Sequence, residues 1–206
     1  MPPLFVLGMV ESGGMAAALQ KISPLEIAAI LFTLANVWLA VKENMWTWPT
    51  GIVSVILYAV VFYQSRFYLN AGLQLIYFVL SVHGWYEWLH GGANKSELRV
   101  RRTTMRQWIG CAVAGVILTA ALYWLSLVIN GQSPFSDAIT TGFSIVGQWM
   151  LNEKLLENWL IWLAVDLIYV PLFYIGGRAP SALLYAFFCI LCVKGYIDWR
   201  KSLVSA

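Results

Sequence analysis

Seven stretches of the chain are apolar over roughly the length of a membrane-spanning helix. A helix that crosses the hydrocarbon core needs about 20 mainly apolar residues. The stretches that qualify are 24–43, 48–65, 68–90, 107–130, 134–152, 155–175 and 179–199. Pro134 and Pro180 stand at helix starts, whereas Pro171 falls inside a helix and is expected to kink it. The pattern predicts an all-α integral membrane protein with seven transmembrane helices.

The composition supports a membrane protein. Hydrophobic residues make up 60% of the 206 residues and charged residues only 11%, against about 25% charged residues in soluble domains. The mean hydropathy is +0.71. The basic residues do not form a stripe on a soluble fold, so the expected partner is the lipid bilayer and not nucleic acid.

The cysteines indicate neither a disulfide framework nor a metal site. Cys111, Cys189 and Cys192 all lie in apolar runs. Cys189 and Cys192 have a C-x-x-C spacing, but no further Cys or His ligand accompanies them. We interpret them as small side chains at helix contacts, and we expect neither a metal nor a cofactor.

The first three and the last three predicted helices share one sequence pattern. Displacing the sequence by 111 positions, without a gap, aligns Trp38 with Trp149, Trp48 with Trp159, Trp88 with Trp199, Tyr58 with Tyr169, and Gly84 with Gly195. Three matches of Trp on Trp in one register are hard to obtain by chance. Duplicated bundles are typical of membrane transporters, which hold their substrate between the copies near the bilayer midplane.

The repeat divides the chain into segments. We expect an N-terminal tail (1–23), a first three-helix bundle (24–90), a basic loop with a linker helix (91–133), a second three-helix bundle (134–200) and a C-terminal tail (201–206). This is a 3+1+3 arrangement. The single linker helix makes the two three-helix repeats parallel, because without it the second copy would be inverted.

The basic residues predict the orientation, since cytoplasmic loops are rich in Lys and Arg. One face receives nine basic residues, namely Lys42, the five of loop 91–106, Lys154, Arg200 and Lys201, and the other face receives Lys21, Arg66 and Arg178. We therefore expect a multi-pass protein of the bacterial cytoplasmic (inner) membrane, with the N-terminus outside and the C-terminus inside.

Polar side chains within the helices are the candidates for a binding site, because polar groups in a membrane face the bundle interior. They fall at helical spacing in three segments: Trp159, Trp162, Asp166 and Tyr169; Gln148 and Asn152; and Asn70, Gln74 and Tyr77. Indole rings stack on flat, preferably cationic, rings. Amides hydrogen-bond to hydroxyls and carboxamides. The set therefore favours an amphipathic ligand with a flat ring and a sugar.

Structural roles are open for several of these residues. Trp159 starts a helix and could be an interfacial anchor. Asn70 and Gln74 could be interhelical hydrogen bonds, and Asp166 could pair with Lys194, which otherwise extends toward the cytoplasmic edge. We interpret Gly84 and Gly195 as points of close helix packing. The aromatic residues near the helix ends, Trp85, Tyr86, Trp88, Tyr196 and Trp199, are expected to form an interfacial belt.

Two motifs resemble those of the PnuC family of bacterial nicotinamide riboside transporters, within the Pnu vitamin transporters. They are W-x-x-W-x-x-x-D at Trp159, Trp162 and Asp166, and W-x-W-P-x-G at Trp46, Trp48, Pro49 and Gly51. The resemblance covers roughly residues 24–200. It implies a SWEET-like fold, facilitated diffusion of nicotinamide riboside for NAD biosynthesis, trapping by a cytoplasmic riboside kinase, and a homotrimer. Of the site residues, it implies only the three of the first motif.

Other functions stay open at this point. Relatives of the family carry other vitamins, such as thiamine or riboflavin, whose rings are also flat. A retinal-binding seven-helix protein would need a buried lysine, yet Lys194 lies near a helix end and 68–90 offers no carboxylate at mid-depth. A membrane enzyme would need a nucleophile with a base or a metal cluster, and no His lies at the depth of Asp166, so we expect no enzymatic activity.

Overall fold

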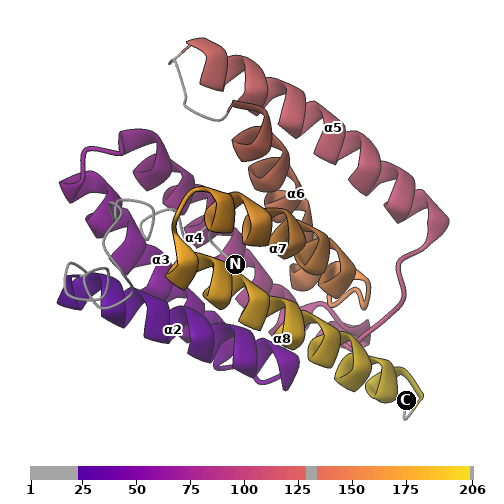
Figure 1. Ribbon diagram of the computed structural model, residues 1–206. Coiled ribbons are helices and arrows are strands. Elements are labelled where there is room, and N and C mark those ends of the chain that lie inside the picture. The colour runs from indigo at the N-terminus through magenta and orange to yellow at the C-terminus, as the bar shows by residue number, and fades with distance from the viewer. Residues whose placement is uncertain (1–22, 129–133, 205–206) are drawn as a thin grey trace.

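The computed structural model describes residues 23–128 and 134–204; the expected N-terminal tail, apart from Ser23, lies outside them. This part of the chain is all-helical (Figure 1). Its helices are α2 (Pro24–Val41), α3 (Thr47–Gln64), α4 (Tyr68–His90), α5 (Met105–Val128), α6 (Pro134–Asn152), α7 (Asn158–Ile175) and α8 (Ala179–Val204), with a short 3-10 turn, η2 (Ala93–Lys95). All seven helices predicted from the sequence are thus confirmed.

The helix ends lie within three residues of the expected ones, except the end of α8. α2 begins after Ser23, whose Oγ accepts a hydrogen bond from the Glu26 amide at 3.2 Å, as an N-cap does. α7 continues through Pro171. α8 does not end at Trp199 but runs on to Val204, so the expected C-terminal tail is helical over residues 201–204.

Five of the described helices (α2, α3, α5, α7 and α8) are long and apolar enough to cross a membrane. The other two have 23 residues in α4 and 19 in α6. At 1.5 Å per residue they are about 34 and 28 Å long, close to the hydrocarbon thickness of about 30 Å. Their lower apolar content reflects the amide and hydroxyl side chains that they carry, which include the predicted Gln74 and Gln148.

The two bundles contact each other through equivalent helices. Within the bundles, α3 packs against α2 and α4, and α7 packs against α6 and α8. Between them, α2 packs against α8 and α4 against α6, so the first helix of each bundle lies beside the third helix of the other. This reciprocity is that of a two-fold axis relating parallel repeats. The linker helix α5 packs along α6, at the edge of the molecule (Figure 1).

Four tryptophans form a continuous chain across this axis. The rings of Trp48 and Trp88 meet edge to face, with centroids 5.2 Å apart at 89°, and Trp159 and Trp199 repeat the pair at 5.4 Å and 87°. Trp88 and Trp199 then contact each other at 5.9 Å. Both have no exposed surface. The expectation that they belong to a lipid-facing belt is therefore wrong, because the opposite bundle covers them.

The same tryptophans hydrogen-bond across the bundles. Trp88 Nε1 donates to the Leu151 carbonyl at 3.0 Å, and Trp199 Nε1 donates to the Ala40 carbonyl at 3.0 Å. Ala40 and Leu151 are themselves equivalent under the displacement of the repeat. Each bundle thus satisfies the buried indole N–H of the other.

Glycine at two equivalent positions makes these contacts possible. A Cβ atom on Gly84 would lie 2.2 Å from the Trp48 ring, and one on Gly195 would lie 2.5 Å from the Trp159 ring. Both distances are far below van der Waals contact, and an indole buried against backbone has little room to move. The prediction of close packing at Gly84 and Gly195 is confirmed.

We expect Gly195→Ala to destabilise the protein by about 1–3 kcal/mol, the usual effect of overpacking a tight core, and to lower the thermal unfolding midpoint in detergent. The matched control is Gly110→Ala on α5, where a Cβ atom would meet nothing within 4 Å. This control should keep or raise the midpoint, since Ala favours helix over Gly. Equal midpoints for the two variants would contradict the packing described here.

Candidate functional site

The predicted stripe on α7 faces the interior of the molecule. Trp159, Trp162, Asp166 and Tyr169 are each at most 2% exposed. A membrane anchor lies at the interface between lipid and water, so the alternative interpretation of Trp159 as an anchor is wrong. The stripe is closed off from its surroundings in this conformation, and a ligand would need movement of the helices to reach it.

Tyr169 is the common neighbour in this region. It interacts with Thr140 of α6 and, electrostatically, with Asp137 and Asp166. Tyr77 of α4 approaches Tyr169 of α7 and Ser144 of α6. Three helices, α4, α6 and α7, therefore converge at mid-depth on one set of polar side chains. The name central cluster here covers the stripe on α7 and two buried residues that share one face of α4 by their spacing: Trp159, Trp162, Asp166, Tyr169, Gln74 and Tyr77.

Several polar atoms of the central cluster have no hydrogen bond of normal geometry. Within the described residues this holds for both amide atoms of Gln74, the hydroxyls of Tyr77 and Tyr169, and Trp159 Nε1. Gln74 and Tyr77 are 1% exposed. Buried polar groups are normally paired, because an unpaired one costs about 1–3 kcal/mol. Such a concentration of unpaired groups is typical of a binding site for a polar ligand.

Asp166 is the only carboxylate of the central cluster. Its hydrogen-bond partner is the thiol of Cys192 on α8, with Sγ 3.5 Å from Oδ2. Lys194 pairs instead with Asp198, at 2.8 Å, so the alternative pairing of Asp166 with Lys194 is wrong. Among the described residues no Lys, Arg or His forms an ion pair with Asp166. A cationic group of a ligand would fit beside it.

The predicted amides divide into two kinds. Asn152 Nδ2 donates to the Leu80 carbonyl of α4 at 2.8 Å, and Gln148 Nε2 donates to Asn152 Oδ1 at 3.1 Å. The first bond joins α6 to α4, and the second lies within α6. Asn70 is half-buried and makes no side-chain hydrogen bond within the described residues. Gln74 is buried, and its amide is unpaired.

The two bundles are alike in shape but not in chemistry. The position equivalent to Trp162 is Gly51, and that equivalent to Asp166 is Val55. Gly51 faces Asn36, since its Cβ would lie 2.8 Å from the Asn36 amide nitrogen, while Trp162 lies against Gly147, at 3.2 Å from a Cβ there. In the first bundle the glycine is on the second helix (Gly51 of α3) and the larger residue on the first (Asn36 of α2). In the second bundle the glycine is on the first helix (Gly147 of α6) and the larger residue on the second (Trp162 of α7). At these two pairs of positions, only the second bundle carries an indole and a carboxylate.

Thr140 was not among the predicted site residues. It is fully buried and lies beside Tyr169. The signal was present, because Thr140, Ser144, Gln148 and Asn152 form one row at intervals of four along α6. Residues four apart share a helix face.

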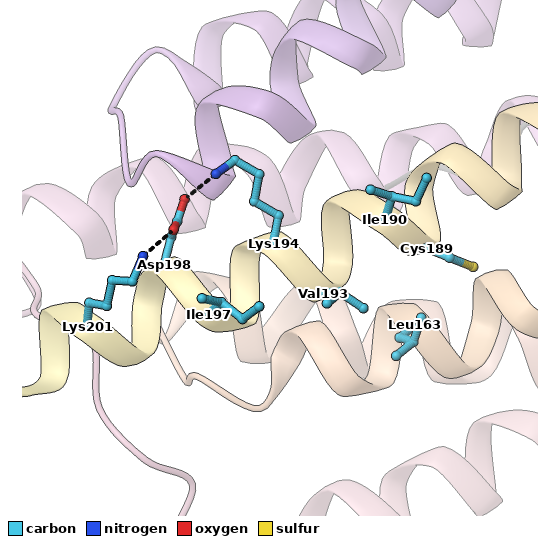
Figure 2. A pocket seen from close by; sticks show the side chains of 8 residues that line it. All are labelled: Leu163, Cys189, Ile190, Val193, Lys194, Ile197, Asp198 and Lys201. Atoms are coloured by element: carbon cyan, nitrogen blue, oxygen red, sulfur yellow. Dashed lines mark hydrogen bonds and ion pairs between the residues drawn. The ribbon is translucent and has the colours of Figure 1, made fainter.

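A surface groove of about 530 Å³ lies elsewhere, between α7 and the outer side of α8 (Figure 2). Its apolar part contains Leu163 and Ile190, and its charged end holds Lys194 and Lys201 bonded to Asp198. The groove contains no aromatic side chain. The central cluster, with its indoles and unpaired polar atoms, is therefore the better candidate for recognition of a ring.

Comparison with known proteins identifies similar sequences. Residues 23–201 match the family described as nicotinamide mononucleotide transporter. The chain is 30% identical over 174 residues to the riboflavin/roseoflavin transporter RibM of Streptomyces davaonensis, covering 82% of this chain and 79% of RibM. It is 29% identical over 188 residues to the nicotinamide riboside transporter PnuC of Neisseria mucosa (85% and 71%). It is 24% identical over 207 residues to PnuC of Escherichia coli (88% and 87%).

A solved structure has the same fold. The crystal structure of the vitamin B3 transporter PnuC matches 98% of this chain with a TM-score of 0.73, at 23% sequence identity and over 91% of its own chain. The chain therefore has the fold of that transporter.

We expect Asn152→Ala to destabilise the protein by about 1–3 kcal/mol, because it removes the hydrogen bond from the buried Asn152 to the Leu80 carbonyl of α4 and the acceptor of Gln148 Nε2. Asn70→Ala, on α4 and without a side-chain hydrogen bond within the described residues, should leave the thermal midpoint within a degree or so of the wild type. Thermal unfolding followed by tryptophan fluorescence measures both. A larger loss for Asn70→Ala than for Asn152→Ala would contradict the assignment of Asn152 to the α4–α6 contact.

Proposed function

Because the chain belongs to the nicotinamide mononucleotide transporter family, we propose that it carries nicotinamide riboside across the membrane. The family and the apolar helices indicate a multi-pass transporter of the bacterial inner membrane, and not an enzyme. The retinal-protein and enzyme alternatives are thereby removed. The substrate is the finer question.

The observation that carries the proposal is the buried Asp166, which has no basic partner among the described residues and shares a helix face with Trp159 and Trp162. Nicotinamide riboside has a pyridinium ring, which carries one positive charge. An indole face attracts a flat cation through its quadrupole, and a carboxylate in a low-dielectric site attracts it further. A cationic ring thus satisfies both features at once.

The remaining polar atoms suit the rest of the molecule. The unpaired amide of Gln74 can bond to the carboxamide, and the hydroxyls of Tyr77 and Tyr169 can bond to the ribose. In this proposal Gln148 completes the polar wall. Asn70 lines the approach, and Asn152 acts mainly by fixing α4 against α6.

The same cluster disfavours the phosphorylated substrate. A nicotinamide mononucleotide adds a phosphate of about two negative charges at neutral pH. The central cluster contains a carboxylate and no Lys or Arg, so the phosphate would be repelled and unpaired. Phosphorylation inside the cell would then prevent escape of the product.

Riboflavin is the second candidate, because the chain is 30% identical to RibM, as close as it is to the Neisseria PnuC. The isoalloxazine ring is flat and would also stack on indoles. It is neutral, however, and gives Asp166 no charge to balance. Thiamine, whose rings carry a cation, is the third candidate and fits the carboxylate better than riboflavin does.

We further propose the mechanism that the family resemblance implies. The carrier equilibrates its substrate by facilitated diffusion, with the bundles 24–90 and 134–200 rocking about the site, and a cytoplasmic riboside kinase traps the product. The chain assembles as a homotrimer. The count of nine basic residues against three supports an N-terminus outside and a C-terminus inside.

Titration of the purified protein with nicotinamide riboside should quench tryptophan fluorescence saturably. Trp162→Ala should abolish the quenching, and Asp166→Asn should weaken binding by about tenfold or more, the value of one charge-assisted contact. Asp198→Asn is the matched control, since that carboxylate lies in the α8 lysine cluster (Figure 2), and it should bind normally. Quenching by riboflavin or thiamine but not by the riboside would overturn the substrate assignment.

Because the riboside is a cation, the membrane potential is held at zero; sealed vesicles containing the protein should then equilibrate external riboside and never concentrate it. An imposed proton or sodium gradient should leave the final level unchanged, because the proposal includes no coupling ion. Uptake of labelled riboside with and without the gradient measures this. Accumulation of unmodified riboside above the external level would show that transport is coupled and not facilitated diffusion.

A further inference from the structure

Two pairs of equivalent residues contact each other across the bundles. Trp88 contacts Trp199, and Glu43 contacts Lys154, with Oε2 and Nζ 3.6 Å apart. A residue that touches its own counterpart in a two-fold arrangement lies on the axis. The axis relating the bundles therefore passes between both pairs. The Glu43–Lys154 pair lies beside the tryptophan chain, at the end of the molecule that carries the nine basic residues counted above, which we call the basic end.

The local backbone places both side chains there in the same way. Glu43 and Lys154 each follow the first helix of their bundle and each have a left-handed conformation, with φ of 52° and 48°. This conformation is uncommon for residues other than Gly, and here it turns the chain sharply just after the helix end. Both turns thus direct a charged side chain to the axis, and the two copies have diverged to opposite charges.

Lys154 is held in an almost closed environment. It is 6% exposed, its Nζ donates to the Leu98 carbonyl at 2.9 Å, and it lies 4.4 Å from the centroid of the Trp88 ring. Burial lowers the pKa of the ammonium, and Glu43 opposes this shift. An ammonium in such a place depends on its partners, since an unpaired buried charge is costly.

Other segments join this pair. Ser202 near the end of α8 donates to Glu43. The loop between η2 and α5 is tied in by the Leu98 amide, which donates to the Trp88 carbonyl at 3.0 Å, and by the ion pair of Arg101 with Glu153. At the opposite end, the equivalent turns at Arg66 and Gly177 make no hydrogen bond or ion pair to the other bundle within the described residues. The basic end is the fastened one.

We propose that Glu43 and Lys154 are the gating residues of the basic end, which must separate before substrate can leave on that side. This rests on the proposed transport function. The intra-bundle pairs Trp48–Trp88 and Trp159–Trp199 stay with their bundles when the bundles rock. Contacts on the axis must part, and two long charged side chains become solvated when they do. Carriers with repeated bundles open by such motion around a fixed site.

The test measures access to two buried positions by a maleimide reagent on the full chain in detergent, with Cys111, Cys189 and Cys192 replaced by Ser. Ala40→Cys, near the end of α2, reports on the basic end, and Val61→Cys, near the end of α3, reports on the opposite end of the bundle. In the parent protein these residues are 3% and 5% exposed. Glu43→Gln should speed labelling at position 40 by about fivefold or more and leave or slow labelling at position 61. Faster labelling at position 40 alone indicates that the conformation open at the basic end has become more populated, whereas a general loss of packing would speed labelling at both positions.

A double variant separates the ion pair from the separate roles of its two residues. Because both residues act through one contact, Glu43→Gln combined with Lys154→Met should speed labelling at position 40 no more than about twofold beyond Lys154→Met alone. Lys154→Met keeps the packing on Trp88 and should give the same result as Glu43→Gln. It is the variant to use if Glu43→Gln does not fold. Glu87→Gln is the matched control: it removes the contact of Glu87 with His83 on the same helix, α4, but none between the bundles, and it should change nothing.

Three results would overturn the gate: unchanged labelling in Glu43→Gln and Lys154→Met, equal acceleration at positions 40 and 61, or fully additive acceleration in the double variant. The labelling needs no substrate, so its failure leaves the proposed substrate untouched. Failure of nicotinamide riboside to bind, with labelling as expected, would instead refute the substrate and leave the gate.

Discussion

The chain of four buried tryptophans across the two-fold axis is the contact on which the rest of the structure depends. Trp48, Trp88, Trp199 and Trp159 are each at most 2% exposed and run without a break from one bundle to the other. In lipid, helices gain little from hydrophobic burial alone, and association depends on packing and interhelical hydrogen bonds. The tryptophans supply both, since two indole N–H groups bond to the opposite bundle.

The three-helix pattern occurs twice in the chain. The contacts that hold the two bundles together, the frame, are symmetric, whereas the residues of the candidate site, the lining, differ between the copies. The frame needs its Trp, Gly and left-handed turn positions in both copies. The lining does not, and there Gly51 and Val55 stand opposite Trp162 and Asp166. The proposed site for a cationic ring therefore lies beside the second bundle, although the two bundles share one architecture. The same divergence turned an equivalent pair on the axis into Glu43 and Lys154.

Much of the fold was predictable from the sequence, because spanning helices have a strong compositional signal and the repeat is ungapped. The stripe on α7 was predictable from helical spacing. The burial of Trp88 and Trp199 was not, since lipid and a neighbouring bundle are equally apolar and both accept an indole near a helix end. Asn152 shows the same limit: its amide bonds to the Leu80 carbonyl, and sequence spacing cannot distinguish such a bond from one to a ligand. The Glu43–Lys154 contact joins residues from different repeats. From the sequence, Lys154 counts only as one of the nine basic residues, and Glu43 has no evident partner.

A structure of the full chain with nicotinamide riboside bound tests the central claim most directly. The account predicts density for the pyridinium ring against Trp162 and within contact of Asp166, with the ribose directed to Tyr77 and Tyr169, and one ligand per chain. Density beside Gly51 and Val55 in the first bundle, or only in the groove on the outer side of α8, would contradict it.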